Sequence, residues 1–238
     1  MKRILALLPL TAFVGCASLS SYQEARVLDK GKAEVFFGAS GYKDDLEKVD
    51  FSFTGANSGK IDTTDGLSNV MLEIGGRIGV WDNLDLGVKY SVPGSIALDA
   101  KYQLLGRDSG SMFQLSAGLK GGYASLDGKN SKGEDVDGVP VIDLIVPVYA
   151  TITPTNWMAL TVAPQFCYRI SDNGYYYPEG PIAGANIGLR MGTTFGIRGE
   201  FGYHRNLDTD YSMMNYGAVF YAPFNPSSLF SGLLGGIL

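Results

Sequence analysis

The stretch from residue 69 to residue 105 constrains the fold most, because apolar and polar residues alternate through it with a period of two. Three segments carry this pattern, at residues 70–80, 84–92 and 95–105. A period of two places successive side chains on opposite faces and therefore predicts β-strands. In each strand the apolar residues occupy one face and the charged residues occupy the other.

The short loops between these segments predict how the strands pair. A hairpin loop with an odd number of residues keeps opposed residues on the same face, and residues 81–83 and 93–95 form two loops of this kind. This register places Lys89 directly opposite Asp99.

The same register places Arg77 diagonal to Asp85, so that opposite charges meet across neighbouring strands. We therefore predict a network of paired charges on the polar face. Its members are Glu73, Arg77, Asp85, Lys89, Asp99 and Lys101.

Similar alternation continues through the rest of the chain and gives about ten strands in all. They are expected at residues 33–40, 70–80, 84–92, 95–105, 112–125, 139–153, 157–170, 182–192, 195–205 and 213–222. Hydrophobic residues make up 45% of the chain and are strongly patterned, which excludes a disordered protein. The net charge of −5 and the lack of a basic stripe argue against a nucleic-acid partner.

The first residues have the order of a secretion signal. Lys2 and Arg3 precede an apolar run at residues 4–14, and Gly15-Cys16-Ala17 supplies small residues at its end. We predict a signal peptide of the lipoprotein type at residues 1–15. Residues 13–16 resemble a bacterial lipobox, which implies that Cys16 is lipidated and begins the mature protein. Ordinary cleavage near Ala17 is the alternative.

The remaining chain divides into three parts. Residues 16–31 are polar and unpatterned and are predicted to form a periplasmic tether. Residues 32–224 contain the strands, and residues 225–238 form an apolar, glycine-rich C-terminal tail.

Three observations indicate that the apolar face points outward into lipid. Long polar loops fall at one end of the strands and short turns at the other, as in outer-membrane barrels. Aromatic residues on the apolar face gather near both strand ends, as expected at membrane boundaries. Basic residues facing lipid near mid-depth would cost roughly 2–4 kcal/mol each, so the charged face must line the interior. We therefore predict an all-β, antiparallel up-and-down transmembrane β-barrel.

At this point the chain resembles bacterial outer-membrane β-barrel proteins. Asn215, Gly217 and Phe220 in the last strand are similar to the pattern that barrel-assembly machinery reads in that class. The resemblance implies location in the bacterial outer membrane with a periplasmic N-terminus. It also implies two partners, outer-membrane lipid and the assembly machinery.

The sequence contains no strong catalytic motif, and we expect no enzyme activity, metal or other cofactor. His204 shares the inward face with Glu200 near the rim, an arrangement that would suit acid-base chemistry. The loop residues Tyr175, Tyr176 and Tyr177 favour either recognition of an extracellular ligand or anchoring at the rim.

The expected function is a structural or surface-interaction role through the extracellular loops. Three alternatives stay open: a narrow solute channel, a hydrolase at the barrel rim, and a periplasmic lipid-binding barrel.

Overall fold

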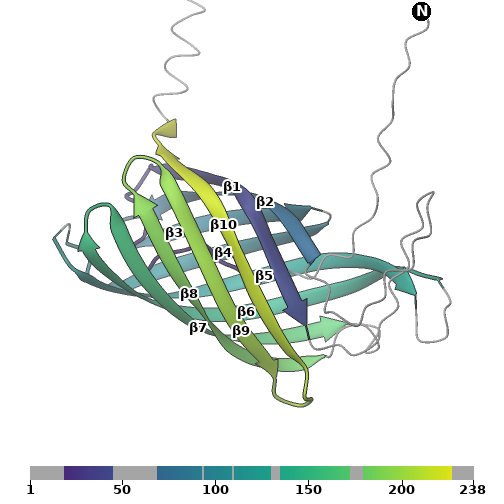
Figure 1. Cartoon of the computed structure of the whole chain (residues 1–238). Helices are drawn as coiled ribbons and strands as arrows, with labels where there is room; N and C mark the ends of the chain where they lie inside the picture. Colours follow the sequence, from purple (N-terminus) through teal and green to yellow (C-terminus); the bar gives the residue numbers. More distant parts are fainter. Residues whose placement is uncertain are drawn as a thin grey trace, which may run out of the picture.

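Ten antiparallel strands form one closed barrel in the computed structural model, which describes residues 19–44, 69–92, 94–108, 110–129, 135–171 and 179–226. Each strand pairs with its neighbours in sequence, and β1 closes the barrel against β10 (Figure 1). The strands are β1 (Ala33–Asp44), β2 (Asn69–Trp81), β3 (Leu84–Val92), β4 (Ser95–Leu105), β5 (Phe113–Lys129), β6 (Asp135–Thr155), β7 (Met158–Ser171), β8 (Gly180–Gly192), β9 (Gly196–Asn206) and β10 (Ser212–Phe224). The predicted up-and-down barrel is confirmed.

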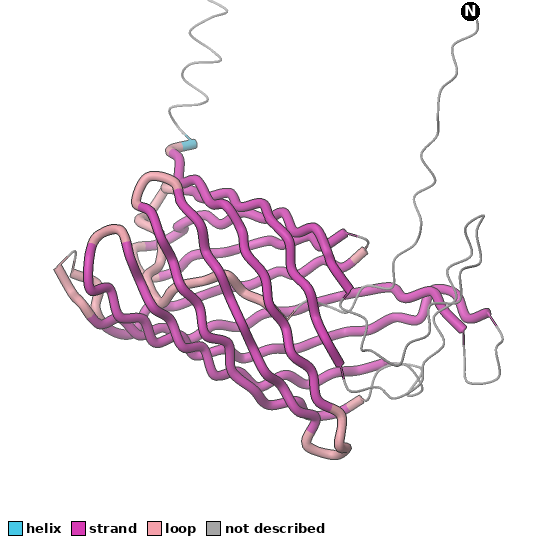
Figure 2. The backbone as a smooth tube through the Cα atoms, in the orientation of Figure 1, coloured by secondary structure: helices cyan, strands magenta, loops and turns pink. Residues whose placement is uncertain are grey.

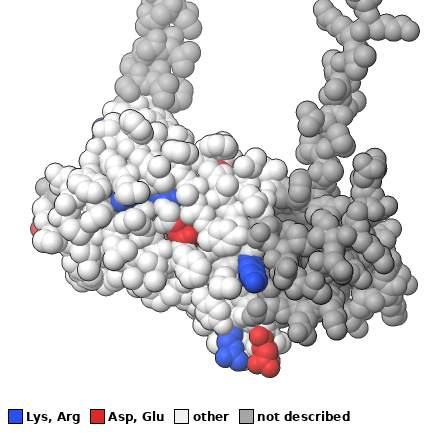
Figure 3. Space-filling model, in the orientation of Figure 1, with Lys and Arg blue, Asp and Glu red and all other residues white. Residues whose placement is uncertain are grey.

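The alternation sorts side chains into an apolar outer face and a charged inner face. Outward side chains stay widely exposed, as at Leu98 (61%) and Phe220 (62%), whereas the inward Glu73 and Asp143 are fully buried. The wall seen in Figure 3 carries few charged side chains. This arrangement inverts that of a soluble protein, and an apolar surface of this extent indicates contact with another apolar phase. Among the described residues, no helix is long and apolar enough to cross a membrane.

Aromatic side chains mark both boundaries of the apolar band. Tryptophans at the short-turn end are exposed, at Trp81 and Trp157. Exposed tyrosines lie toward the long-loop end of their strands, at Tyr90, Tyr123, Tyr168, Tyr203 and Tyr216. Amphipathic rings favour the headgroup region of a bilayer, so the two rings of aromatics bracket the lipid-facing band.

The hairpin between β3 and β4 corrects the predicted register by two residues. Lys89 lies opposite Ala97 rather than Asp99. The turn closes earlier than expected because Gly94 donates its N–H to the Ser91 carbonyl at 2.8 Å with a φ of +152°, a conformation that suits glycine. A shift of two residues preserves the face of every side chain, so Lys89 still points inward.

An arginine at an outward position should separate lipid-facing from water-facing sites of equal exposure. Leu119→Arg on β5, 54% exposed and opposite Ala100 in the middle of β4, should lower the free energy of unfolding by about 2–4 kcal/mol, because its charge would face hydrocarbon. Leu207, 58% exposed but placed in the β9–β10 turn, is the matched control, and Leu207→Arg should change stability by less than about 0.5 kcal/mol. Urea unfolding in lipid vesicles, followed by tryptophan fluorescence, measures both. Equal losses would contradict the lipid-facing assignment.

Candidate functional site

The inner face brings together the charges that the sequence predicts as a network. The Arg77 guanidinium lies 2.7 Å from the Asp85 carboxylate and also contacts Asp99, and the Lys101 ammonium lies 3.5 Å from Asp85. A Cβ at Gly87 would lie 2.6 Å from Asp99 Oδ2, so glycine leaves the space that this cluster occupies.

The other two predicted residues pair nearer the long-loop end. Lys89 Nζ lies 3.4 Å from Glu73 Oε2, and the hydroxyls of Ser40 and Ser91 donate to Glu73 Oε1 at 2.7 and 3.4 Å. All six predicted side chains therefore line one lumen, in two separate clusters.

The lumen is occupied by the chain itself. Residues 19–32, here called the lumenal segment, run inside the wall of strands as a loop-coloured tube in Figure 2. We expected residues 16–31 to form a tether outside the barrel. Residues 19–22, 25 and 27 are instead buried, with exposures of 1% at Leu19, 6% at Ser21 and 0% at Ala25, whereas residues 26 and 29–32, toward the short-turn end, are exposed. The difference arises because the wall binds the backbone of the segment, which no side-chain pattern reveals.

Glu200 on β9 holds the segment by two successive backbone N–H groups. Its carboxylate accepts hydrogen bonds from Ser21 N at 2.9 Å and Tyr22 N at 2.8 Å, and from Ser21 Oγ at 3.1 Å. A Cβ at Gly217 would lie 2.1 Å from the Tyr22 hydroxyl, so this glycine admits the ring.

Three lysines of the wall donate to carbonyl groups of the segment. Lys89 and Lys120 both donate to the Ser20 carbonyl, at 2.6 and 3.0 Å. Lys101 donates to the Glu24 carbonyl at 2.7 Å and to a second carbonyl two residues on at 3.0 Å. Charged donors make stronger hydrogen bonds than neutral ones, so these lysines bind the segment firmly.

Side chains of the wall also accept hydrogen bonds from backbone N–H groups in the C-terminal half of the segment. Each of these bonds joins a strand side chain to the backbone. The acceptors are Thr151 Oγ1 for Ala25 N at 2.8 Å, Gln103 Oε1 for Val27 N at 3.1 Å and Asp85 Oδ2 for Leu28 N at 3.2 Å. Backbone N–H and C=O groups thus make most of the contacts of the segment. Every residue type except proline carries both groups.

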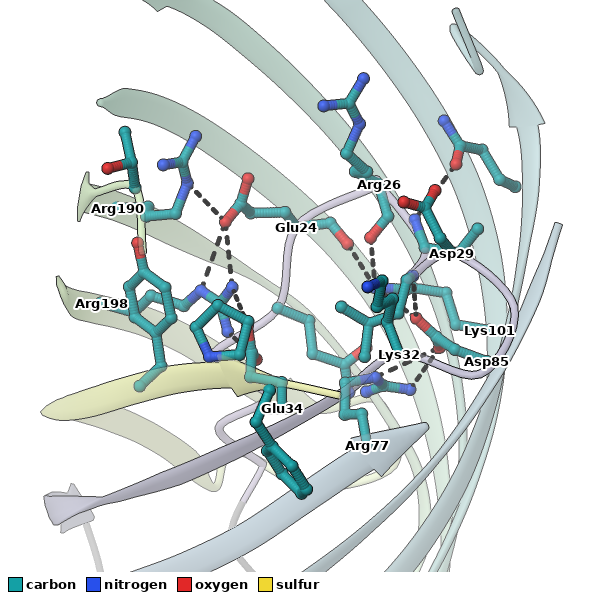
Figure 4. Close-up of a pocket in the computed structure, with 18 of the residues that line it drawn as sticks. Glu24, Arg26, Asp29, Lys32, Glu34, Arg77, Asp85, Lys101, Arg190 and Arg198 are labelled. Carbon is teal, nitrogen blue, oxygen red and sulfur yellow. Dashed lines mark hydrogen bonds and ion pairs between the residues drawn. The ribbon is translucent and has the colours of Figure 1, made fainter. Parts of the chain in front are cut away.

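A cavity of about 680 Å³ remains beside the segment at the short-turn end (Figure 4). The Glu24 carboxylate projects into it and lies 2.7 Å from Arg190 and 3.2 Å from Arg198. Arg198 also contacts Glu34 and stacks over the Tyr221 ring, 4.1 Å from its centroid. Glu24, Glu34, Arg190 and Arg198 thus line the cavity already paired with partners of opposite sign.

His204 is placed for packing rather than for access to substrate. The ring is 1% exposed, and Nε2 lies 2.9 Å from Asn215 Oδ1 and 3.0 Å from Asn186 Oδ1. The nearby Glu200 is occupied by the lumenal segment. Across the described ranges, no group of three or more His, Cys, Asp and Glu side chains is arranged to hold a metal ion.

The other predicted site residues lie outside the described residues. They are Cys16 and the three loop aromatics, Tyr175, Tyr176 and Tyr177. The apolar tail predicted at 225–238 is described only at residues 225–226.

Comparisons with known proteins support the fold. No family model and no curated protein matches the chain. The translocator domain of the autotransporter NalP from Neisseria meningitidis is similar over 83% of this chain and 90% of that chain, with a TM-score of 0.50 and 9% identity. Ail, the attachment invasion locus protein of Yersinia pestis, matches over 82% and 99%, with a TM-score of 0.32 and 8% identity. The likeness to the NalP translocator domain supports the closed β-barrel, and at 9% identity it concerns the fold alone.

Removing the Glu200 carboxylate should loosen the upper half of the lumenal segment. A hydrogen bond to a charged group contributes about 1.5–3 kcal/mol, and about 1.4 kcal/mol corresponds to a tenfold change. We therefore expect Glu200→Ala to raise amide hydrogen exchange at Ser21 and Tyr22 roughly ten- to hundredfold.

The control for this experiment is Asp210→Ala, which removes an exposed ion pair with Arg205 of 3.1 Å. It should leave both amides unchanged, because exposed pairs contribute little. Unchanged exchange in Glu200→Ala, in a barrel whose gel mobility still shifts on heating, would show that this carboxylate does not hold the segment.

Proposed function

We propose that this chain is a non-enzymatic barrel of the bacterial outer membrane, closed by its own lumenal segment, which acts through its long loops at the cell surface. The observation that carries the proposal is the course of residues 19–32 inside the barrel. With the lumen filled, the loops remain as the parts available to a partner.

The upper half of the lumen argues against the alternative of a solute channel. The Leu19 side chain packs into a buried apolar cluster that includes Tyr42, Met71 and Tyr211. Nearer the short-turn end, Glu200 and the wall lysines form hydrogen bonds with the backbone of the segment. An ion entering this region would have to leave water without gaining new partners, which is unfavourable.

The other two alternatives also lose support. A periplasmic lipid-binding barrel needs an apolar interior, whereas this interior holds Glu73, Arg77 and their partners. A rim hydrolase needs an accessible acid-base group, whereas His204 is held by two asparagines. Outer-membrane lipid would cover the apolar band, and the assembly machinery would act during insertion. Any extracellular ligand would meet the long loops, where Tyr175, Tyr176 and Tyr177 are the candidate contacts.

Single-barrel recordings in planar lipid bilayers test this function. The intact protein should show no stable conductance, because its lumen is filled. A variant that keeps the signal peptide but lacks residues 19–29 should show discrete conductance steps, provided that its gel mobility still shifts on heating. Stable conductance by the intact protein would favour the channel instead. A truncated barrel that folds and stays silent would show that the segment is not what closes the lumen.

A further inference from the structure

The lumenal segment has a direction, which its two ends define. At its C-terminal end, Gly31 N donates to the Gly79 carbonyl at 2.8 Å, and Gly79 N donates to the Lys32 carbonyl at 2.9 Å. Gly79 lies beside the short β2–β3 turn, and Ala33 begins β1 at the same end of the barrel. The segment therefore leaves the lumen among the short turns.

The N-terminal end of the segment lies in the opposite half of the barrel. The Leu19 carbonyl accepts hydrogen bonds from Gln165 Nε2 at 3.3 Å and Asn186 Nδ2 at 3.1 Å. Its side chain contacts the apolar cluster that contains Tyr211 and Met213, which flank the start of β10 at the long-loop end. The segment therefore approaches from among the long loops.

Between these ends the segment passes through the barrel once. Its contacts with the wall advance in order, from Lys120 at residue 20, through Glu200 at residues 21 and 22 and Thr151 at residue 25, to Asp85 at residue 28. Residues 19 and 32 are 13 steps apart, which reach about 43 Å at about 3.3 Å per residue. This length exceeds the apolar band of a barrel, which is about 25 Å tall.

We propose that the mature N-terminus lies on the same side of the membrane as the long loops, at the cell surface. This rests on the orientation in the proposed function, in which the long loops face outward. Cys16 precedes Leu19 by three residues, which span at most about 11 Å. A lipid on Cys16 therefore anchors in the outer leaflet, because the inner leaflet lies beyond that reach. This N-terminus is opposite to the periplasmic one that the outer-membrane resemblance implies.

Labelling of single cysteines on intact cells with a membrane-impermeant maleimide tests the proposal in the full-length chain. Ser18→Cys reports on the N-terminus. Asp208→Cys in the exposed β9–β10 turn reports on the long-loop end, and Thr194→Cys in the exposed β8–β9 turn reports on the short-turn end. Cys167 is buried and contributes little background. The wild-type chain corrects for any labelling of an unmodified Cys16.

The expected result is that Ser18→Cys and Asp208→Cys label in intact cells, with no further gain when the cells are permeabilised, while Thr194→Cys labels only after permeabilisation. Labelling of Ser18→Cys only after permeabilisation, with Asp208→Cys still labelled outside, would overturn the threading but leave the proposed function standing. Labelling of Thr194→Cys outside and Asp208→Cys inside would overturn both, because the barrel would be inverted.

A second probe covers the case in which residue 18 is shielded from the reagent. An eight-residue epitope inserted between Ala17 and Ser18 is detected with antibody before and after permeabilisation, in parallel with the same epitope inserted between β1 and β2, within residues 45–68. Detection of both epitopes on intact cells supports the proposal. Detection of the N-terminal epitope only in permeabilised cells overturns it.

Discussion

Charged side chains cannot face hydrocarbon, so a ten-stranded barrel must find partners for all its membrane-level charges inside a narrow lumen. Some pair directly across the wall, as Arg169 does with Asp143 at 2.7 Å with both side chains fully buried. Others contact the lumenal segment, as Glu200 and Lys120 do. Filling the lumen is therefore a consequence of sorting the charges inward.

An extended backbone is well suited to this role. Each peptide group offers one donor and one acceptor, so a single strand of chain can satisfy carboxylates and ammonium groups without adding charge. In a helix the same backbone groups would already be paired with one another. The side chains at Ser20, Ser21 and Ala25 are small, which lets the wall approach the main chain. The segment also carries charged side chains, and one of them, Glu24, is paired with Arg190 and Arg198 of the wall.

How much of this structure the sequence predicts depends on whether side chains or main-chain groups make the contacts. Alternation is a property of side chains, and it predicts the strands, the two faces and the inward charges. Odd hairpin loops set parity but not register, which is why Lys89 is displaced by two residues from its expected partner. The lumenal segment is held through N–H and C=O groups common to almost all residues, so its pattern resembles that of a free tether. One residue of the segment does indicate its position. Glu24 is acidic, and the predicted inner face contains Arg190 and Arg198, with which Glu24 pairs in the structure.

The two ends of the segment differ in a way that limits how the lumen can change. At the short-turn end the segment continues directly into β1, so covalent connection keeps it in the mouth of the barrel even if its hydrogen bonds break. Toward the long-loop end, non-covalent contacts hold it: packing around Leu19, hydrogen bonds from Gln165 and Asn186 to the Leu19 carbonyl, and hydrogen bonds from the wall lysines to the Ser20 carbonyl. The cavity beside Glu24 lies at the covalently connected end, and the segment separates it from the long-loop end of the barrel. Withdrawal of the segment toward the long-loop end would break these contacts and leave the chain attached at Ala33.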